Sequence, residues 1–424
     1  MEIGSRIRFF RIQKNMTQEE LADKIISISY LSKIENNQTS ASIEVLEMLC
    51  DRLGIKLIED EEYTILKELN DWYYKIIHKK KDEAVKFYES FEKKTNSNDS
   101  RVAILYVLYE LRYFIFTRQL DKAEEHINKI NLFKDILDTK MNYYYEKFVG
   151  HFHYLLNRFS VSLKYFKESE RILGGSIHFE SWEQADLFYY IGLVYNRLGK
   201  LALSIVYIQK ALSIYQSLYD LKRSAECQIL LGISYEKIDE FELAEENYRL
   251  AHKVAEGIND SHLLGMIYHN LGIVMSKQEK ALEAIEHYKK SLQFKTDQMI
   301  VGKLRTIQGL IEEYYNLGNI EKSQELLKQG KSLVEKNKEL NLREYEIHFM
   351  YYDYLYYDSD NLAKFIEKEA LPYFEGTEHL IQIASYAEKL GKYYYENHKY
   401  KLASHYLSKA VTLLKKQGHI NIRS

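Results

Sequence analysis

A pattern of small and large residues repeats at intervals of forty residues in the middle of the chain. Gly192, Gly232 and Gly272 begin three copies, and each glycine is followed after twelve residues by a small residue, then a large one, then a second small one. The residues at those positions are Ser204, Ile208 and Ala211; Ala244, Tyr248 and Ala251; and Ala284, Tyr288 and Ser291. Small side chains at this spacing let two helices cross closely, while the large residue fills the adjoining gap. The pattern therefore predicts stacked helical hairpins.

This motif resembles the tetratricopeptide pattern, G-x2-Y followed by A-x3-F, in a unit longer than the usual length of about 34 residues. Counting in both directions places the position of Gly192 at six further residues. They are Trp72, Leu111, Gly150, Ile311, Tyr351 and Gly391. The sequence thus predicts an all-α superhelix of about nine repeats, in which each repeat contacts its neighbours and a long inner surface is exposed.

The composition agrees with a helical, intracellular chain. One proline and 18 glycines among 424 residues leave few positions that break helices. The chain has no run of 18 apolar residues and no signal or transit peptide at its start, so we expect a cytoplasmic protein without a membrane segment. Cys50 and Cys227 lie far apart, which is typical of a reducing compartment and argues against disulfides. The net charge of −3 does not suggest nucleic acid binding along the whole chain.

The first segment of the chain does not follow the repeat. Residues 3–14 predict a helix with Ile3, Ile7 and Phe10 facing inward and Phe9 as a further candidate. Residues 17–20 form a capping box, which opens a second helix through Ile25. A third helix covers residues 29–35, and a fourth runs from residue 42 to 53 before Gly54. The expected core of this four-helix bundle is Leu21, Ala22, Leu31, Ile34, Leu46 and Leu49.

Residues 16–22 and 31–36 of this bundle resemble the XRE/Cro-type, lambda-repressor-like helix-turn-helix. That resemblance implies a DNA-binding domain at residues 1–58, whose third helix enters the major groove of double-stranded DNA. The residues that it assigns to DNA binding are Ser27, Ser29, Tyr30 and Lys33. It also implies that Arg11 or Arg8 pairs with Glu35. The alternative is a helix-turn-helix fold retained only for protein interaction.

Charge and layout favour an oligomer. Residues 1–54 carry seven Lys and Arg against eight Asp and Glu, so one copy should bind the DNA backbone weakly. Two copies held at a fixed spacing would bind well, because the second contact becomes intramolecular. We therefore expect a homodimer or tetramer formed through the terminal repeats. The candidate contact residues are Tyr393, Tyr394, Tyr395 and Tyr400.

Polar breaks mark the other boundaries. The acidic run at residues 59–62 predicts a hinge within a linker at residues 59–70, followed by the repeat array at residues 71–424. A second polar stretch, residues 95–100, is consistent with the loop between the first two repeats.

Four positions of each first helix share one face: six and two residues before the repeat's glycine position, and one and five after it. In tetratricopeptide arrays this face lines the groove, and we call it the groove face. It presents apolar and aromatic residues with isolated polar groups, which suits an extended peptide. The peptide-binding candidates are Arg112, His151, Asp186, Tyr190, Glu226, Asn270, Arg305 and Glu312. The amide of Asn270 offers a donor and an acceptor to a peptide unit, although an asparagine bonded within its own repeat is an equal alternative on sequence alone.

A helix-turn-helix followed by about nine long repeats resembles the RRNPP family of quorum-sensing receptors, and the layout resembles its NprR branch. The resemblance implies a transcription regulator that binds a short reimported peptide in the groove, with an asparagine like Asn270 on the peptide backbone. Its Rap branch implies an alternative, or a second activity: antagonism of a sporulation response regulator. Phosphate-binding loops, serine nucleophile elbows and zinc motifs are absent from the sequence, so we expect no enzyme of another kind, no cofactor and no metal.

Overall fold

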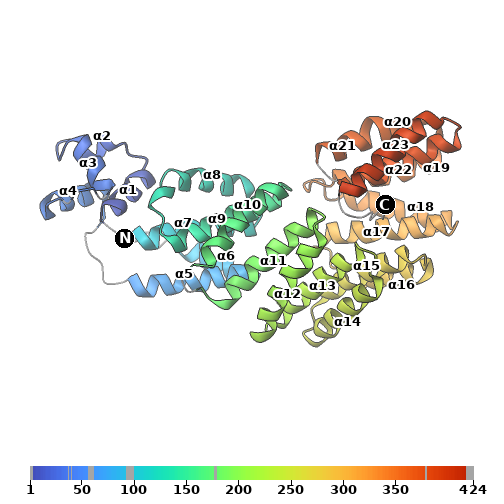
Figure 1. Cartoon of the computed structure of the whole chain (residues 1–424), viewed down its shortest axis with the longest axis horizontal. Coiled ribbons are helices and arrows are strands. Elements are labelled where there is room, and N and C mark those ends of the chain that lie inside the picture. Colours follow the sequence, from blue (N-terminus) through green and yellow to red (C-terminus); the bar gives the residue numbers. More distant parts are fainter. Residues whose placement is uncertain are drawn as a thin grey trace. The chain divides into compact units, whose positions relative to one another are not determined.

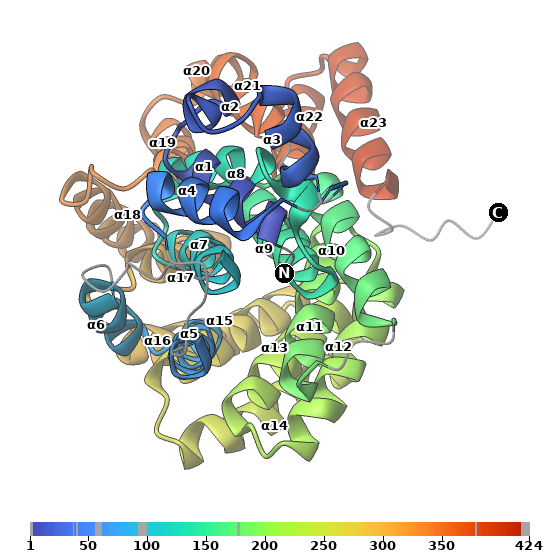
Figure 2. The ribbon, with the colours of Figure 1, turned by 90° about the vertical axis from the view of Figure 1, so that its left-hand side faces the viewer.

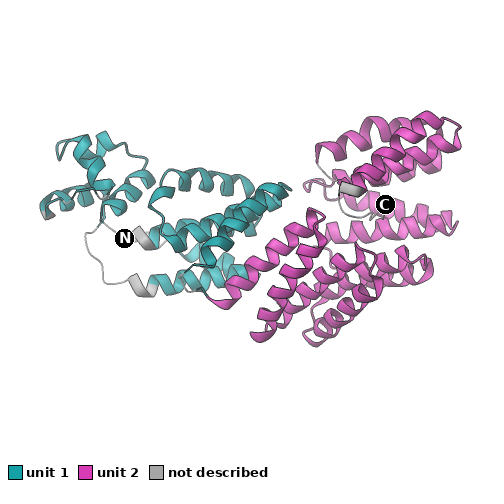
Figure 3. Cartoon of the chain, viewed as in Figure 1, with its two compact units in different colours: residues 1–179 teal, residues 180–424 magenta. Residues whose placement is uncertain are grey.

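The computed structural model describes residues 3–36, 38–39, 41–55, 62–91, 100–175, 179–377 and 380–416. Within these ranges every regular element is a helix, as Figure 1 shows. The chain forms two compact units, Met1–Phe179 and Glu180–Ser424, which are coloured separately in Figure 3. Residues 59–61 of the predicted hinge and residues 95–99 of the second polar stretch lie outside the described residues.

The first unit begins with four short helices: α1 (Ile3–Gln13), α2 (Gln18–Ala22), α3 (Ile28–Glu35) and α4 (Ile43–Leu53) (Figure 2). The predicted capping box is present, since the Thr17 hydroxyl accepts from the Glu20 amide and the Glu20 carboxylate accepts from the Thr17 amide. Helix α2 ends at Ala22, three residues before the predicted end, because Asp23 leaves the helical conformation with ψ 127° and Lys24 follows in the left-handed region with φ 56°.

The predicted core of this bundle is largely confirmed. Leu21, Ala22, Leu31, Ile34 and Leu49 are buried, whereas Leu46 is only half-buried. Gly54 ends α4 with a φ of 60°, the left-handed conformation that glycine adopts readily at a helix end.

Helix α1 also packs against the repeats of its own unit. Phe9 is fully buried, and its ring centroid lies 4.9 Å from that of Phe133 at an interplanar angle of 86°. Arg8 forms an ion pair with Asp135, which lies two residues after Phe133. The helix-turn-helix bundle and the first repeats therefore form one compact unit, and residues 62–70, which the sequence assigned to a linker, belong to the first repeat helix, α5.

The remaining helices pair as successive hairpins. In the first unit these are α5 (Glu62–Ile77) with α6 (Lys81–Phe91), α7 (Ser100–Phe116) with α8 (Leu120–Asn131), and α9 (Thr139–Leu155) with α10 (Phe159–Leu173). In the second unit they are α11 (Ser181–Arg197) with α12 (Leu201–Ser217), α13 (Leu221–Glu236) with α14 (Phe241–Gly257), α15 (Ser261–Lys277) with α16 (Ala281–Phe294), α17 (Ile300–Asn316) with α18 (Ile320–Glu335), α19 (Arg343–Tyr357) with α20 (Ser359–Phe365), and α22 (Leu380–Glu396) with α23 (Tyr400–Lys416). The described residues thus contain nine hairpins, in the predicted phase.

The eighth hairpin departs from the regular form. Its second helix, α20, continues through a π-helical turn, Ile366–Ala370, into α21 (Leu371–Gly376). The single proline of the chain, Pro372, follows this turn as the second residue of α21, where its missing amide hydrogen interrupts the helical hydrogen bonds. The sequence pattern did not predict this break.

The small and large residues of the repeat motif meet as predicted. A Cβ atom added at Gly232 would lie 2.5 Å from the ring of Tyr248, and one added at Gly272 would lie 2.5 Å from the ring of Tyr288. Such distances leave no room for a side chain, so glycine at these positions lets the two helices of a hairpin approach closely. The repeat phase therefore rests on packing within each hairpin.

Three further features concern only the described part of the chain. None of its helices is long and apolar enough to cross a membrane. None of its groups of His, Cys, Asp and Glu is arranged to hold a metal ion. Cys50 and Cys227 are both buried and carry free thiols.

Candidate functional site

The first candidate site is the exposed side of α3. Ser27 caps this helix, because its hydroxyl accepts a hydrogen bond from the Tyr30 amide at 3.2 Å. Ser29 and Lys33 are exposed and Tyr30 is half-buried, while Leu31 and Ile34 face the core of the bundle. The four residues assigned to DNA binding thus lie on one short helix and its N-cap, and the apolar side of that helix packs against the bundle.

A buried carboxylate holds α3 in place. Glu35 receives the Arg11 guanidinium through two bonds, Nε to Oε1 at 2.6 Å and an Nη to Oε2 at 2.9 Å. The Gln18 amide donates to the same Oε2 at 2.8 Å, which joins α2 to the pair. Of the two arginines proposed for Glu35, the structure selects Arg11, since Arg8 pairs with Asp135. The bidentate Arg11–Glu35 ion pair and the Gln18 hydrogen bond together fix the orientation of α3 relative to α1 and α2.

The second candidate site is the groove face of the second unit. Asn270 and Tyr190 are half-buried, and Arg305 and Glu312 are exposed. The Asn270 amide makes no hydrogen bond within the described part of the chain, which argues against the alternative that it is bonded within its own repeat. It lies on the middle of α15 with its donor and acceptor available to a ligand.

Two other candidates of this unit belong to an internal charge network. Arg223 donates to Asp186 at 2.7 Å, to Glu226 at 2.5 Å and to the Tyr215 hydroxyl at 2.9 and 3.1 Å. Arg223, Asp186 and Glu226 are 3%, 1% and 8% exposed, respectively. Burial raises the pKa of the Tyr189 and Tyr215 phenols well above the ordinary tyrosine value. The network joins α11, α12 and α13, so Asp186 and Glu226 have a structural role here.

Sequence reasoning missed Arg223 because the residue lies outside the four positions of the groove face. The only signal was local: an arginine three residues before Glu226 on the same helix. Its bond to Asp186, 37 residues earlier, depends on how successive hairpins stack.

Arg112 and His151 belong to the first unit. Both are buried, and the His151 ring packs edge-on against Phe166 with 5.0 Å between centroids. The other six peptide-binding candidates belong to the second unit.

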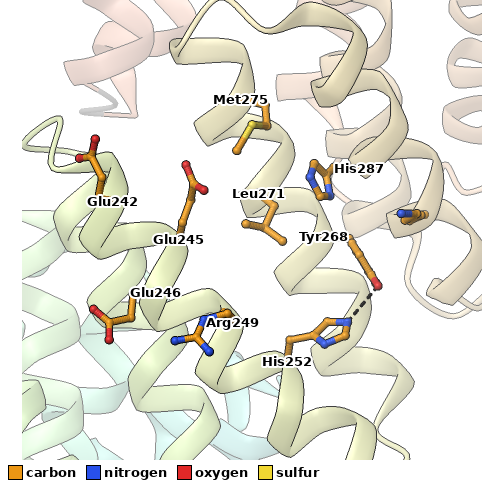
Figure 4. Close-up of a pocket in the computed structure, with 10 residues that line it drawn as sticks. Glu242, Glu245, Glu246, Arg249, His252, Tyr268, Leu271, Met275 and His287 are labelled. Carbon is orange, nitrogen blue, oxygen red and sulfur yellow. Dashed lines mark hydrogen bonds between the residues drawn. The ribbon is translucent and has the colours of Figure 1, made fainter.

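A separate cavity of about 680 Å³ lies on the second unit (Figure 4). Helix α15 contributes Tyr268, Leu271 and Met275 to it. At 3.6 residues per turn these three residues lie on the side of α15 opposite to Asn270 and Ile273, so the cavity is distinct from the groove face. The other lining residues come from α14 and α16: Glu242, Glu245, Glu246, Arg249, His252, His287 and Lys290.

Comparisons with known proteins agree with this architecture. A helix-turn-helix model matches residues 7–59, and a tetratricopeptide-repeat model matches residues 183–257 and 231–297. The "Transcriptional activator NprA" of Geobacillus stearothermophilus is 42% identical over 412 residues, which cover 94% of this chain and 100% of that protein. "Regulatory protein RapC" of Bacillus subtilis is 26% identical over 356 residues, covering 80% of this chain and 91% of that protein.

Solved structures show the same fold. The apo quorum sensor NprR from B. thuringiensis has a TM-score of 0.67 and 22% identity, and the match covers 84% of this chain and 100% of that one. A Rap protein complexed with competence and sporulation factor has a TM-score of 0.70 and 17% identity, with 84% and 98% coverage.

Fold and sites together define a class of protein: a helix-turn-helix domain joined to an array of tetratricopeptide-type hairpins. Within that class, the 42% identity with NprA over 94% of the chain shows the family to which the protein belongs. The chain belongs to the RRNPP family.

Proposed function

We propose that this chain is a transcription regulator that binds operator DNA through α3 and a short signalling peptide through the groove face. The observation that carries the proposal is the 42% identity with a transcriptional activator over 94% of the chain. The exposed side of α3 and the available amide of Asn270 supply the two binding surfaces. A solved NprR structure of the same fold contains its cognate peptide NprX, which supports the choice of ligand class. As a regulator that binds operator DNA, the protein would act in the cytoplasm.

Peptide binding would control DNA binding by a shift between two curvatures of the repeat array. A peptide that contacts several hairpins at once binds one curvature better than the other, and only this difference in affinity moves the equilibrium. In a dimer, a change of curvature alters the distance between two copies of α3. That distance must match the spacing of operator half-sites.

The first test is Asn270→Ala. We expect this variant to stay folded and to lose roughly 1–3 kcal/mol of peptide binding, because the peptide groups that the amide pairs would be left unsatisfied. Isothermal titration with a short peptide that the wild-type protein binds measures the loss. Arg305 and Glu312 should contribute less uniformly, according to the peptide sequence.

Asn247→Ala serves as the matched control, since the Asn247 amide donates to the Leu243 carbonyl of its own helix α14 at 2.8 Å. It should bind the peptide like the wild type. Wild-type affinity in Asn270→Ala would place the peptide elsewhere on the chain.

We further propose that the last hairpin mediates assembly. Tyr395 and Tyr400 are 61% and 57% exposed and border a shallow cavity of about 620 Å³ on α23. Tyr394, by contrast, is buried and donates to Glu367 at 2.7 Å, so it belongs to the core of the repeats. Exposed aromatic residues on a terminal hairpin are typical of a contact with a second copy.

Changing Tyr395 and Tyr400 together to serine should therefore yield a monomer at micromolar concentration and weaken operator binding. Sedimentation velocity measures the first effect and gel shifts the second. Tyr357→Ser, which alters a tyrosine 64% exposed on α19, should leave both unchanged. A double variant that still sediments as the wild type does would place the contact elsewhere.

An action on a response regulator is a second proposal. Sequence relatives include "Response regulator aspartate phosphatase A" of Bacillus subtilis, 22% identical over 331 residues, with 74% of this chain covered. Incubation of the protein with a phosphorylated sporulation-type response regulator separates the two functions. Faster loss of phosphate supports this activity, and an unchanged rate leaves transcription control as the function.

A further inference from the structure

The side chain of Lys295 passes between α15 and α17, which are the first helices of two successive hairpins in the second unit. Lys295 follows the last residue of α16, and its stem lies beside Gly265 of α15 and Gly302 of α17. A Cβ atom at Gly265 would lie 3.2 Å from Lys295 Cγ, and one at Gly302 would lie 3.4 Å from Cε. The two glycines therefore leave room for the stem, which carries the ammonium group away from the end of α16 and into the gap between α15 and α17.

The ammonium group enters a buried polar cluster. Lys295 Nζ donates to the Gly302 carbonyl at 2.9 Å and to the Thr306 hydroxyl. The same hydroxyl lies 3.1 Å from His269 Nδ1 and 3.3 Å from the Ser291 hydroxyl. Thr306 and Ser291 are fully buried, and His269 is 7% exposed. The second ring nitrogen of His269 has no hydrogen-bond partner within the described part of the chain.

Among the described residues, no carboxylate forms an ion pair with the cationic groups of this cluster. Burial and the nearby Arg305 guanidinium lower the pKa of Lys295 to about 7. Burial, together with Lys295 and Arg305, lowers the pKa of His269 well below the ordinary histidine value. Within the described residues Lys295 forms no ion pair, and Asp297, two residues away, pairs with Lys303 at 2.5 Å instead. A partly buried ammonium without a counter-ion is costly, and an anion brought by a ligand would remove that cost.

The position of the cluster connects it with the predicted peptide site. His269 directly precedes Asn270 on α15, and Arg305 lies on the groove face of α17. We propose that Lys295 and Arg305 receive a carboxylate of the bound peptide, while the buried Thr306 hydroxyl, itself beside His269, holds the lysine in position. The inference rests on the proposed function and adds a charge requirement for the ligand. That carboxylate is either the peptide's C-terminus or an aspartate or glutamate side chain.

The probes are two pools of short random peptides of the same composition, one with free C-termini and one with amidated C-termini. Each pool is passed over the immobilised full-length protein, and retained peptides are identified by mass spectrometry. One retained peptide is then resynthesised as the free acid, as the C-terminal amide, and with each Asp or Glu changed to its amide. Isothermal titration measures all forms against the wild type, Lys295→Gln and Lys295→Met.

We expect both Lys295 variants to weaken binding about tenfold or more, as the loss of one charge-assisted hydrogen bond predicts. Neutralising the correct peptide carboxylate should cause a similar loss in the wild type and little further loss in Lys295→Gln, since both changes remove the same interaction. The peptide form that shows this coupling identifies the carboxylate as terminal or side-chain. Lys303→Gln, which removes a lysine paired with Asp297, is the matched control and should bind normally.

The outcomes separate the two proposals. If no peptide is retained from either pool, the proposed peptide receptor is wrong and this inference is wrong with it. If peptides are retained but bind Lys295→Gln and Lys295→Met as tightly as the wild type, only the carboxylate site is overturned. Should a lysine variant fail to fold, the comparison of acid and amide forms on the wild type still decides: equal affinity for every form excludes the carboxylate.

Discussion

Replacing Tyr30 and Lys33 together with alanine is expected to abolish sequence-specific DNA binding while the helix-turn-helix bundle remains folded. Lys33 is exposed on α3 and Tyr30 is half-buried there, whereas the core side of the helix is formed by Leu31 and Ile34. A lost base contact costs about 1–3 kcal/mol, so two lost contacts cost roughly 2–6 kcal/mol. Gel shifts on the native promoter, alongside circular dichroism, measure both parts of the prediction.

A charge-matched control is available on α5 of the same unit. Lys67 is exposed there, so Lys67→Ala removes one positive charge outside the helix-turn-helix. It should change operator binding far less than the double variant does. Because Tyr30 also contributes to packing, Lys33→Ala alone separates a lost contact from a weakened fold. Unchanged gel shifts with an intact fold would show that the recognition residues lie elsewhere on the domain.

The features that the sequence predicted are those encoded over short distances. The capping box of Thr17 and Glu20 spans four residues and appears as expected. The glycine motif pairs Gly232 with Tyr248, sixteen residues later and within one hairpin. Because each hairpin packs its two helices in the same way, three clear copies of the motif were enough to predict the positions of all the repeats. The pairing of Glu35 with Arg11 followed from resemblance, and geometry then chose between two arginines.

The features that escaped prediction depend on contacts between distant segments. Phe9 and Phe133 are far apart in sequence, and nothing near Phe9 distinguishes a residue that packs on the repeats from one in the bundle core. The sequence near Lys295 likewise does not show that its side chain enters the space between α15 and α17. Only the structure places its stem beside Gly265 and Gly302. Position on the groove face does not show whether a carboxylate is available to a ligand. Asp186 has such a position, but its carboxylate is already paired with the buried Arg223.

That internal arginine gives the largest expected effect on stability. Arg223→Leu should lower the free energy of unfolding by about 3–5 kcal/mol, because Asp186 and Glu226 would remain buried without their cation. The loss should appear as a lower midpoint in urea denaturation at neutral pH, followed by far-ultraviolet circular dichroism. Since the network joins α11, α12 and α13, the variant should also unfold its second unit less cooperatively.

Two comparisons distinguish the lost ion pairs from the lost volume of the arginine. Adding Asp186→Asn and Glu226→Gln to Arg223→Leu removes the stranded charges and should recover about half of the loss or more, since a neutral network costs less to bury. Arg249→Leu, an exposed arginine on α14, should change stability by no more than about 0.5 kcal/mol. If Arg223→Leu instead unfolds like Arg249→Leu, the buried network does not stabilise the repeats. Asp186 and Glu226 would then be held in place for a ligand, and their amide variants should weaken peptide binding rather than the fold.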